Sequence, residues 1–176
     1  MVINKKFPQG GRRLTGAWCF LVLVLAWPQA ATGNDAVLRI GSLLPPLTLS
    51  AIGQAAVRIP DSIKGKVVIL HFWQVGCSSC RLEMPAMDEL YVKYRRKGLE
   101  ILAVNIGQRK EIVQAFAAEL RVSYPILIDP DGKITKLYGV TDVPRTYVLD
   151  RSGVIRYRIL GGATPEMLKK LIYGLF

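Results

Sequence analysis

Residues 67–80 read VVILHFWQVGCSSC, an apolar run followed by a short loop and two cysteines. The run over 67–73 is apolar except for His71 and does not alternate, which is typical of a β-strand buried on both faces. The residues that follow, 78–97, have the apolar spacing of a helix that Gly98 ends. Cys77 and Cys80 are therefore predicted to lie where a central strand passes into a helix.

The remaining segments alternate between strand and helix patterns. The helix over 78–97 is expected to carry its apolar side chains on one stripe, and these are Leu82, Met84, Met87, Leu90, Tyr91 and Tyr94. Further strands are predicted at 99–106 and 125–128, a helix at 110–121, hairpins at 47–59 and 146–160, a turn at 129–132, and a last helix that Thr164 caps. This order predicts an α/β fold, a mixed central sheet with helices on both faces and an N-terminal β-hairpin extension.

Composition and charge limit the classes of protein. The chain has 176 residues, 51% of them hydrophobic, which excludes a disordered chain and leaves room for one ordinary domain. The net charge is +11, and no basic block after residue 33 is longer than Arg95–Lys97. We interpret this as a solvated basic surface that favours acidic partners or anionic lipid, with no nucleic-acid groove.

Residues 1–33 are typical of an export signal. Arg12 and Arg13 precede an apolar run over 17–27, and small residues follow Pro28. We predict a cleaved signal peptide that leaves Asn34 as the first mature residue, with an uncleaved membrane anchor over 14–31 as the alternative. Either way residues 34–176 form the domain, and it lies in the periplasm or another extracytoplasmic space, where disulfide chemistry is permitted.

The spacing of Cys77 and Cys80 indicates redox chemistry. A helix N-terminus stabilises a thiolate, and the i to i+3 spacing brings the two sulfurs within reach of a disulfide. Cys77, at the end of the strand, is predicted to be the exposed attacking thiol, and Cys80 the resolving thiol.

Other readings of the pair remain open but have weaker support. A structural zinc site needs four ligands, and once the signal that contains Cys19 is removed, the one cysteine pair and the single histidine His71 leave a gap. Covalent haem attachment would need a histidine where Arg81 stands, and a peroxidase site a threonine where Gln74 stands. No histidine lies downstream for a copper chaperone, and a static structural disulfide is the remaining alternative. We predict no metal, nucleotide or organic cofactor.

The sequence resembles the thioredoxin-fold thiol–disulfide oxidoreductases of the bacterial TlpA/ResA type, which include the reductases of cytochrome c maturation. The resemblance runs from about Gly41 to Phe176. It rests on three segments, residues 67–73, 77–85 (CSSCRLEMP) and 142–150 (DVPRTYVLD). It implies a thioredoxin-like fold.

The resemblance also implies roles for particular residues. Cys77 and Cys80 match the redox pair, and Glu83 matches a glutamate beside it that exchanges a proton with Cys80. Pro144 matches a cis-proline that faces the pair, and the backbone of Val143 matches the edge to which a substrate chain adds as a strand. Trp73 matches an aromatic residue near the active site and is expected to help bind the substrate, with simple core packing as its alternative.

Four residues depart from the family pattern. Gly76 stands where a tryptophan is frequent, and Ser78 and Ser79 stand where relatives commonly have a proline. The two hydroxyls can hydrogen-bond a thiolate and so make the disulfide a stronger oxidant, which leaves the direction of electron flow open. His71 stands where relatives carry a buried polar residue, and it is either a proton relay or a satisfied core histidine.

The sequence thus predicts an extracytoplasmic enzyme that reduces disulfides of partner proteins. A membrane thiol-transfer protein would restore its electrons, and apocytochrome c is one candidate substrate. The alternatives are a dithiol oxidase or isomerase on the same fold, and a non-catalytic binding module that uses the Val143–Pro144 groove.

Overall fold

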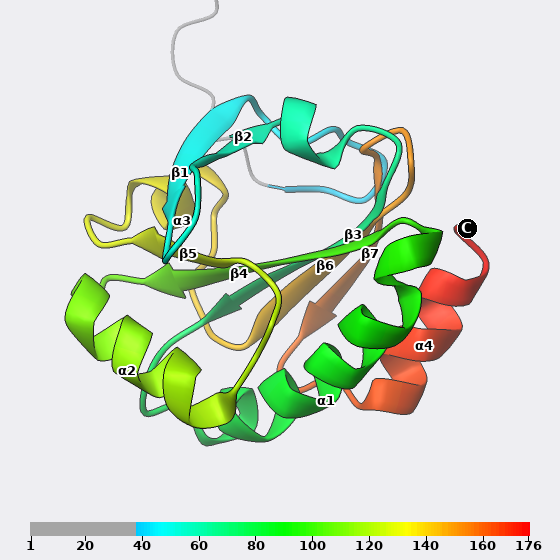
Figure 1. The fold of residues 1–176 in the computed structure, drawn as a ribbon. Coiled ribbons are helices and arrows are strands. Elements are labelled where there is room, and N and C mark those ends of the chain that lie inside the picture. Colours follow the sequence, from blue (N-terminus) through cyan, green and yellow to red (C-terminus); the bar gives the residue numbers. More distant parts are fainter. Residues whose placement is uncertain (1–37) are drawn as a thin grey trace, which may run out of the picture. The chain divides into compact units, whose positions relative to one another are not determined.

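The computed structural model describes residues 38–176, so the predicted export signal lies outside the described residues. The described part contains a mixed sheet of seven strands in the order β2-β1-β5-β4-β3-β6-β7 (Figure 1). The strands are β1 (Leu47–Ala51), β2 (Val57–Ile59), β3 (Val67–Trp73), β4 (Leu99–Ile106), β5 (Ile126–Asp129), β6 (Arg145–Leu149) and β7 (Ile155–Leu160).

Strand β3 lies inside the sheet and is buried along its whole length. It pairs in parallel with β4 and antiparallel with β6, so that Leu70 stands opposite Leu102 on one side and Tyr147 on the other. Its side chains divide between two apolar cores, since Ile69 and Trp73 face one and Leu70 and Phe72 the other. Both faces of the sheet at β3 are therefore shielded from water, which explains why its apolar run does not alternate.

Helices cover both faces of the sheet, as predicted. They are α1 (Ser78–Tyr94), α2 (Lys110–Leu120), α3 (Lys133–Leu137) and α4 (Pro165–Tyr173), with short 3₁₀ helices η1 (Asp61–Ile63) and η2 (Arg95–Lys97). Figure 1 shows α1, α2 and α4 against one face, and α3 and η1 on the other side. Strands β1 and β2 pair antiparallel, with Leu47 opposite Ile59, and β1 continues the sheet by pairing with β5.

Two features differ from the sequence prediction. Leu82 is not part of the buried stripe of α1, because its side chain is 78% exposed while Cys80, Met84 and Met87 are buried. At 3.6 residues per turn, Leu82 lies roughly 200° around the helix from Met84, which turns it away from the sheet. Helix α3 was also missed. It follows the predicted turn because the Asp129 carboxylate accepts hydrogen bonds from the first helical N–H groups.

The peptide bond before Pro144 is cis, as the family resemblance implied, and a second cis bond precedes Pro60. Thr164 caps α4 as predicted, with its hydroxyl accepting from the Met167 N–H. Within residues 38–176, none of the helices combines the length and the apolar character needed to cross a bilayer.

Candidate active site

The two cysteines form a disulfide at the start of α1. Cys77 is the N-cap of the helix, and its sulfur accepts a hydrogen bond from the Cys80 N–H at 3.2 Å. Cys77 is half-buried and Cys80 is fully buried. A partner sulfur arriving from solvent can therefore reach Cys77 and cannot reach Cys80. The positive end of the helix dipole acts on the Cys77 sulfur, which favours the Cys77 thiolate in the reduced protein.

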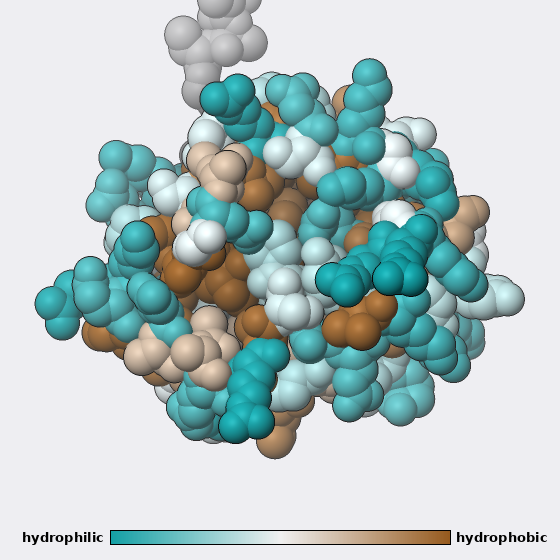
Figure 2. Space-filling view, in the orientation of Figure 1, coloured by the Kyte–Doolittle hydropathy of each residue, from teal (hydrophilic) through white to brown (hydrophobic). Residues whose placement is uncertain are grey.

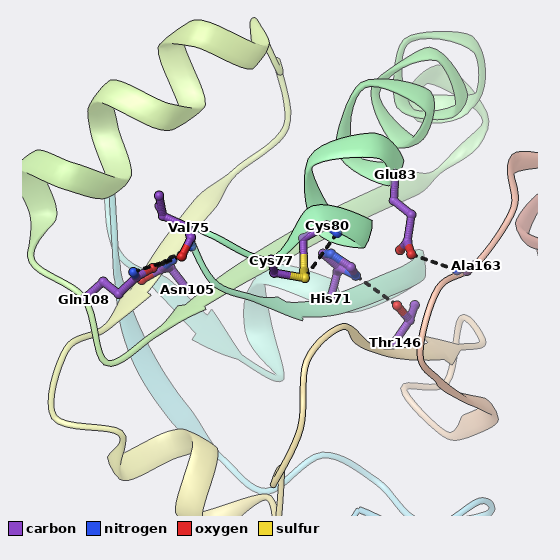
Figure 3. Close-up of a disulfide and its surroundings, with 9 residues drawn as sticks. All are labelled: His71, Val75, Cys77, Cys80, Glu83, Asn105, Gln108, Thr146 and Ala163. Atoms are coloured by element: carbon purple, nitrogen blue, oxygen red, sulfur yellow. Dashed lines mark hydrogen bonds between the residues drawn. A yellow bond between two sulfur atoms is a disulfide. The ribbon is translucent and has the colours of Figure 1, made fainter.

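The loop before Cys77 is held by an amide clamp that sequence reasoning missed. The Gln108 carbonyl oxygen accepts from the Val75 N–H at 2.7 Å and from the Asn105 side-chain amide at 2.9 Å (Figure 3). The Gln108 amide in turn donates to the Val75 carbonyl. Gln108 follows β4, so its position beside this loop depends on the parallel pairing of β3 with β4, and no local sequence signal marks it.

Glu83 lies one turn into α1, on the side of the helix that faces the segment before α4. Its carboxylate is buried and accepts a hydrogen bond from the Ala163 N–H at 3.0 Å (Figure 3). Burial raises the pKa of Glu83 to about 6, against a smaller lowering by that hydrogen bond. A carboxyl group with this pKa changes its protonation close to neutral pH, as a proton-transfer group must.

His71 lies under the disulfide, on the face of β3 that α1 covers. Its Nδ1 is 2.9 Å from the Thr146 hydroxyl on the neighbouring strand β6 (Figure 3). Burial lowers the pKa of His71 to about 4, so the ring is neutral at physiological pH. Its Nε2 makes no hydrogen bond within the described residues.

Trp73 is fully buried and stacks on Phe116 of α2, with ring centroids 5.3 Å apart. The Arg81 guanidinium lies over the other ring of this pair, 4.6 Å from the Phe116 centroid, and pairs with Glu119. Trp73 thus supports the base of the site from within the core and offers no surface to a partner chain in this structure.

Val143 and Pro144 lie at the same end of the sheet as the cysteines. Arg145 stands opposite Phe72, so the preceding residue Pro144 reaches the level at which β3 ends. Val143 is half-buried and packs on the apolar core that contains Cys80. The buried Arg145 holds this loop by pairing with Asp142 at 2.5 Å.

The profile of the AhpC/TSA family matches residues 40–158. The chain belongs to the AhpC/TSA family.

Relatives of this AhpC/TSA-family chain are named as thiol-disulfide oxidoreductases. The thiol-disulfide oxidoreductase ResA of Geobacillus thermodenitrificans is 39% identical over 165 residues, which cover 90% of this chain and 94% of that protein.

Solved structures of proteins with similar names have the same fold as this chain. A Chlorobium tepidum protein assigned as the thiol:disulfide interchange protein DsbE superposes with a TM-score of 0.73 at 29% identity, covering 78% of this chain and 98% of that one. The thioredoxin domain of a Bacteroides vulgatus thiol-disulfide oxidoreductase superposes with a TM-score of 0.69 at 25% identity. The match covers 79% of this chain and 99% of that one.

This AhpC/TSA-family member is therefore a thiol–disulfide oxidoreductase with a thioredoxin-like fold. A groove of about 510 Å³ adjoins its disulfide, between the first turns of α1 and the segment 162–165. Ser78, Ser79 and Glu83 line the groove together with Leu82, which also borders a smaller hollow beside Cys77. The exposed Leu82 side chain, which was wrongly predicted to be buried, is thus an apolar surface at the active site.

Residues 38–176 contain no group of three or more side chains that could hold a metal ion. The groups beside the disulfide are one carboxyl, one neutral imidazole and serine hydroxyls. This set supports proton transfer during thiol–disulfide exchange.

Proposed function

We propose that this oxidoreductase reduces disulfides of partner proteins outside the cytoplasm. The observation that carries the proposal is the arrangement of the two sulfurs, with Cys77 accessible at a helix N-terminus and Cys80 buried one turn below it. This asymmetry supports attack on a partner by Cys77 and resolution by Cys80.

The reaction begins with the reduced dithiol. The Cys77 thiolate attacks one sulfur of the partner's disulfide, a Cys77–partner bond forms, and the partner's other sulfur leaves as a thiolate. Cys80 then attacks Cys77, which releases the second partner sulfur and forms the Cys77–Cys80 bond. Two electrons have passed to the partner, and the protein is left in the disulfide state that the structure holds.

Glu83 is the proposed proton acceptor for Cys80. It lies one turn beyond Cys80 on α1, and its pKa of about 6 leaves it mostly ionised at neutral pH. An ionised carboxylate can take the proton as the buried Cys80 thiol becomes a nucleophile. When electrons return to the disulfide, the same group can give the proton back.

The partner's chain is proposed to lie along the cis-proline loop. An extended chain beside Val143 can pair with its backbone by strand addition, while the exposed Leu82 and the groove beside it contact side chains of the partner. Trp73 was predicted to bind substrate, but its burial leaves it an indirect role through the core.

The setting of the reaction is also part of the proposal. Export through residues 1–33 would place the domain in the periplasm or at the outer face of the inner membrane. A membrane thiol-transfer protein would then supply electrons. Cytochrome c maturation, with apocytochrome c as substrate, is the pathway that the family resemblance supports.

The reduction potential of the Cys77–Cys80 pair tests the direction of electron flow. Protein is equilibrated with glutathione or dithiothreitol buffers, and the oxidised fraction is counted by thiol alkylation and mass. A potential near or below about −220 mV supports a reductase. A potential near about −120 mV would instead favour a dithiol oxidase, for which the exposed Ser78 and Ser79 at the helix N-terminus are the structural argument.

A further inference from the structure

A cluster of basic side chains lies at the end of the sheet away from the disulfide. We call it the basic end, and it consists of Lys64, Arg95, Arg96, Lys97 and Arg151, all of them exposed. None of the five forms an ion pair within residues 38–176, because the nearby carboxylates Glu100 and Asp150 pair with Lys66 and Arg156. Figure 2 shows hydrophilic side chains gathered at the right of the view, over the end of α1.

Arg151 holds the three segments of the basic end together. Its guanidinium donates to the Gly65 carbonyl at 3.2 Å and to the Lys97 carbonyl at 3.1 Å, and its own carbonyl accepts from the Gly65 N–H. Carbonyl partners leave the positive charge of the guanidinium unneutralised. The segments at 64–65, 95–97 and 151–153 therefore present one connected positive surface.

An apolar groove of about 380 Å³ borders this surface. Ile63 and Ser152 line it, and each is the chain neighbour of a member of the basic end. Leu43, 63% exposed, forms another wall, and Ile40 three residues earlier is 65% exposed. The lining of the groove is almost wholly apolar, comprising Leu43, Leu44, Pro45, Pro46, Ile59, Pro60, Ile63, Ser152 and Gly153.

We propose that the basic end and the adjoining Leu43 groove dock on a bilayer that contains anionic lipid. Clustered lysine and arginine side chains bind anionic headgroups, and exposed apolar side chains beside them enter the interface. A nucleic acid or an acidic protein would satisfy the charges, but it would leave the Leu43 and Ile40 side chains without a function.

Docking in this way sets the direction in which the active site faces. The basic end adjoins Val67, the first residue of β3, and Cys77 follows Trp73, the last. Seven strand residues at about 3.3 Å each separate the two ends by roughly 23 Å. The bilayer would thus hold the domain with Cys77 turned to the aqueous phase, where partner proteins are found.

Hydrogen exchange of the full chain with vesicles tests the proposal. One set of vesicles is phosphatidylcholine alone, and the other contains equal parts of phosphatidylcholine and phosphatidylglycerol. We expect slower exchange at residues 40–46, 64–65, 95–97 and 151–153 only with phosphatidylglycerol, and no change at 76–80. Comparison of two vesicle types on one chain removes any contribution of residues 1–33 that does not depend on the headgroup.

Paired variants separate the surface from overall charge. Arg95→Gln with Arg96→Gln should raise the phosphatidylglycerol content needed for half-maximal protection and weaken vesicle affinity roughly 25-fold, about fivefold for each arginine. Arg109→Gln with Lys110→Gln makes the same charge change at the opposite end of the sheet and should have little effect. Leu43→Ser should weaken protection without changing charge.

Three results would overturn the proposal. The first is equal exchange in both kinds of vesicle, and the second is an equal loss in the two double variants. The third is the same protection by a soluble polyanion such as heparin, which would show a site for an acidic macromolecule. None of these outcomes bears on the redox reaction, so the docking surface can fail while the proposed function stands.

Discussion

Gly162 lies directly against the Glu83 carboxylate, so that a Cβ at residue 162 would come within 2.8 Å of Glu83 Oε1. The same carboxylate oxygen accepts the Ala163 N–H. The segment before α4 therefore holds the Glu83 carboxylate, and it does so with backbone atoms.

Gly162→Ala should displace the Glu83 carboxylate and break its hydrogen bond to Ala163. We expect a loss of about 1 to 2 kcal/mol in the free energy of unfolding, and a change in the pH at which Glu83 titrates. Urea unfolding and the pH profile of disulfide reduction measure the two effects. Gly174→Ala is the control, because a Cβ there meets no atom within 4 Å. Equal stability of the two variants would show that the contact carries no energy.

Glu83→Gln should remove the proton acceptor and leave the shape of the site unchanged. In the parent protein, kcat for reduction of a small protein disulfide should rise as pH passes through about 6, since the carboxylate must be ionised to accept the Cys80 proton. The variant should lose this step and at least about 100-fold in kcat at pH 7. Glu89→Gln, exposed on the same helix, is the matched control. A step near pH 6 that survives in Glu83→Gln would assign it to another group.

His71 should make the folded state less stable in acid. The unfolded chain binds a proton at His71 below pH 6.5, whereas the folded chain binds it only near pH 4. The free energy of unfolding should therefore fall as pH decreases from 6.5 to 4, by about 3 kcal/mol in all. Glu83 acts in the opposite direction between pH 4.5 and 6, because its folded pKa is raised.

Urea unfolding of the parent and of His71→Asn across this pH range isolates the histidine. The decrease in the free energy of unfolding between pH 6.5 and 4 should therefore appear in the difference between the parent and variant curves. His71→Leu serves as a second variant if the buried asparagine prevents folding. A parent curve that runs parallel to both variants would mean that His71 does not titrate as its burial implies.

Gln108→Ala should free the loop that leads to Cys77. Loss of the Val75 and Asn105 hydrogen bonds is expected to cost about 1 to 3 kcal/mol and to speed amide exchange at Val75. Gln114→Ala on the exposed side of α2 removes a similar side chain without these contacts. Slow exchange at Val75 in the Gln108 variant would show that other contacts hold the loop.

Cys80→Ser should trap a partner protein as a mixed disulfide on Cys77, because the resolving sulfur is gone. Cys77→Ser should give no adduct and no turnover, since the remaining sulfur is buried. Non-reducing electrophoresis and mass spectrometry identify the adduct. An adduct on Cys80 in the Cys77 variant would reverse the order of attack, and a Cys77 variant that still binds its partner would favour a binding module.

Local pattern predicted most of the elements. The unbroken apolar run of β3, the Gly98 stop and the Thr164 cap each depend on a few neighbouring residues, so they could be read directly. Helix α3 was missed because its start depends on a side chain at Asp129 that accepts its N–H groups. Leu82 was misplaced because hydrophobicity alone does not say which side of a helix faces the sheet.

The sequence by itself determined the chemistry of this protein, a CxxC pair where a buried strand becomes a helix, since these residues are neighbours in the chain. Tertiary structure decided what surrounds the pair. Gln108 holds the loop before Cys77, Thr146 lies beside His71, and Ala163 binds Glu83 from 80 residues away. These contacts join segments far apart in the chain, and only the pairing of β3 with β4 and β6 and the packing of α4 on α1 bring them together.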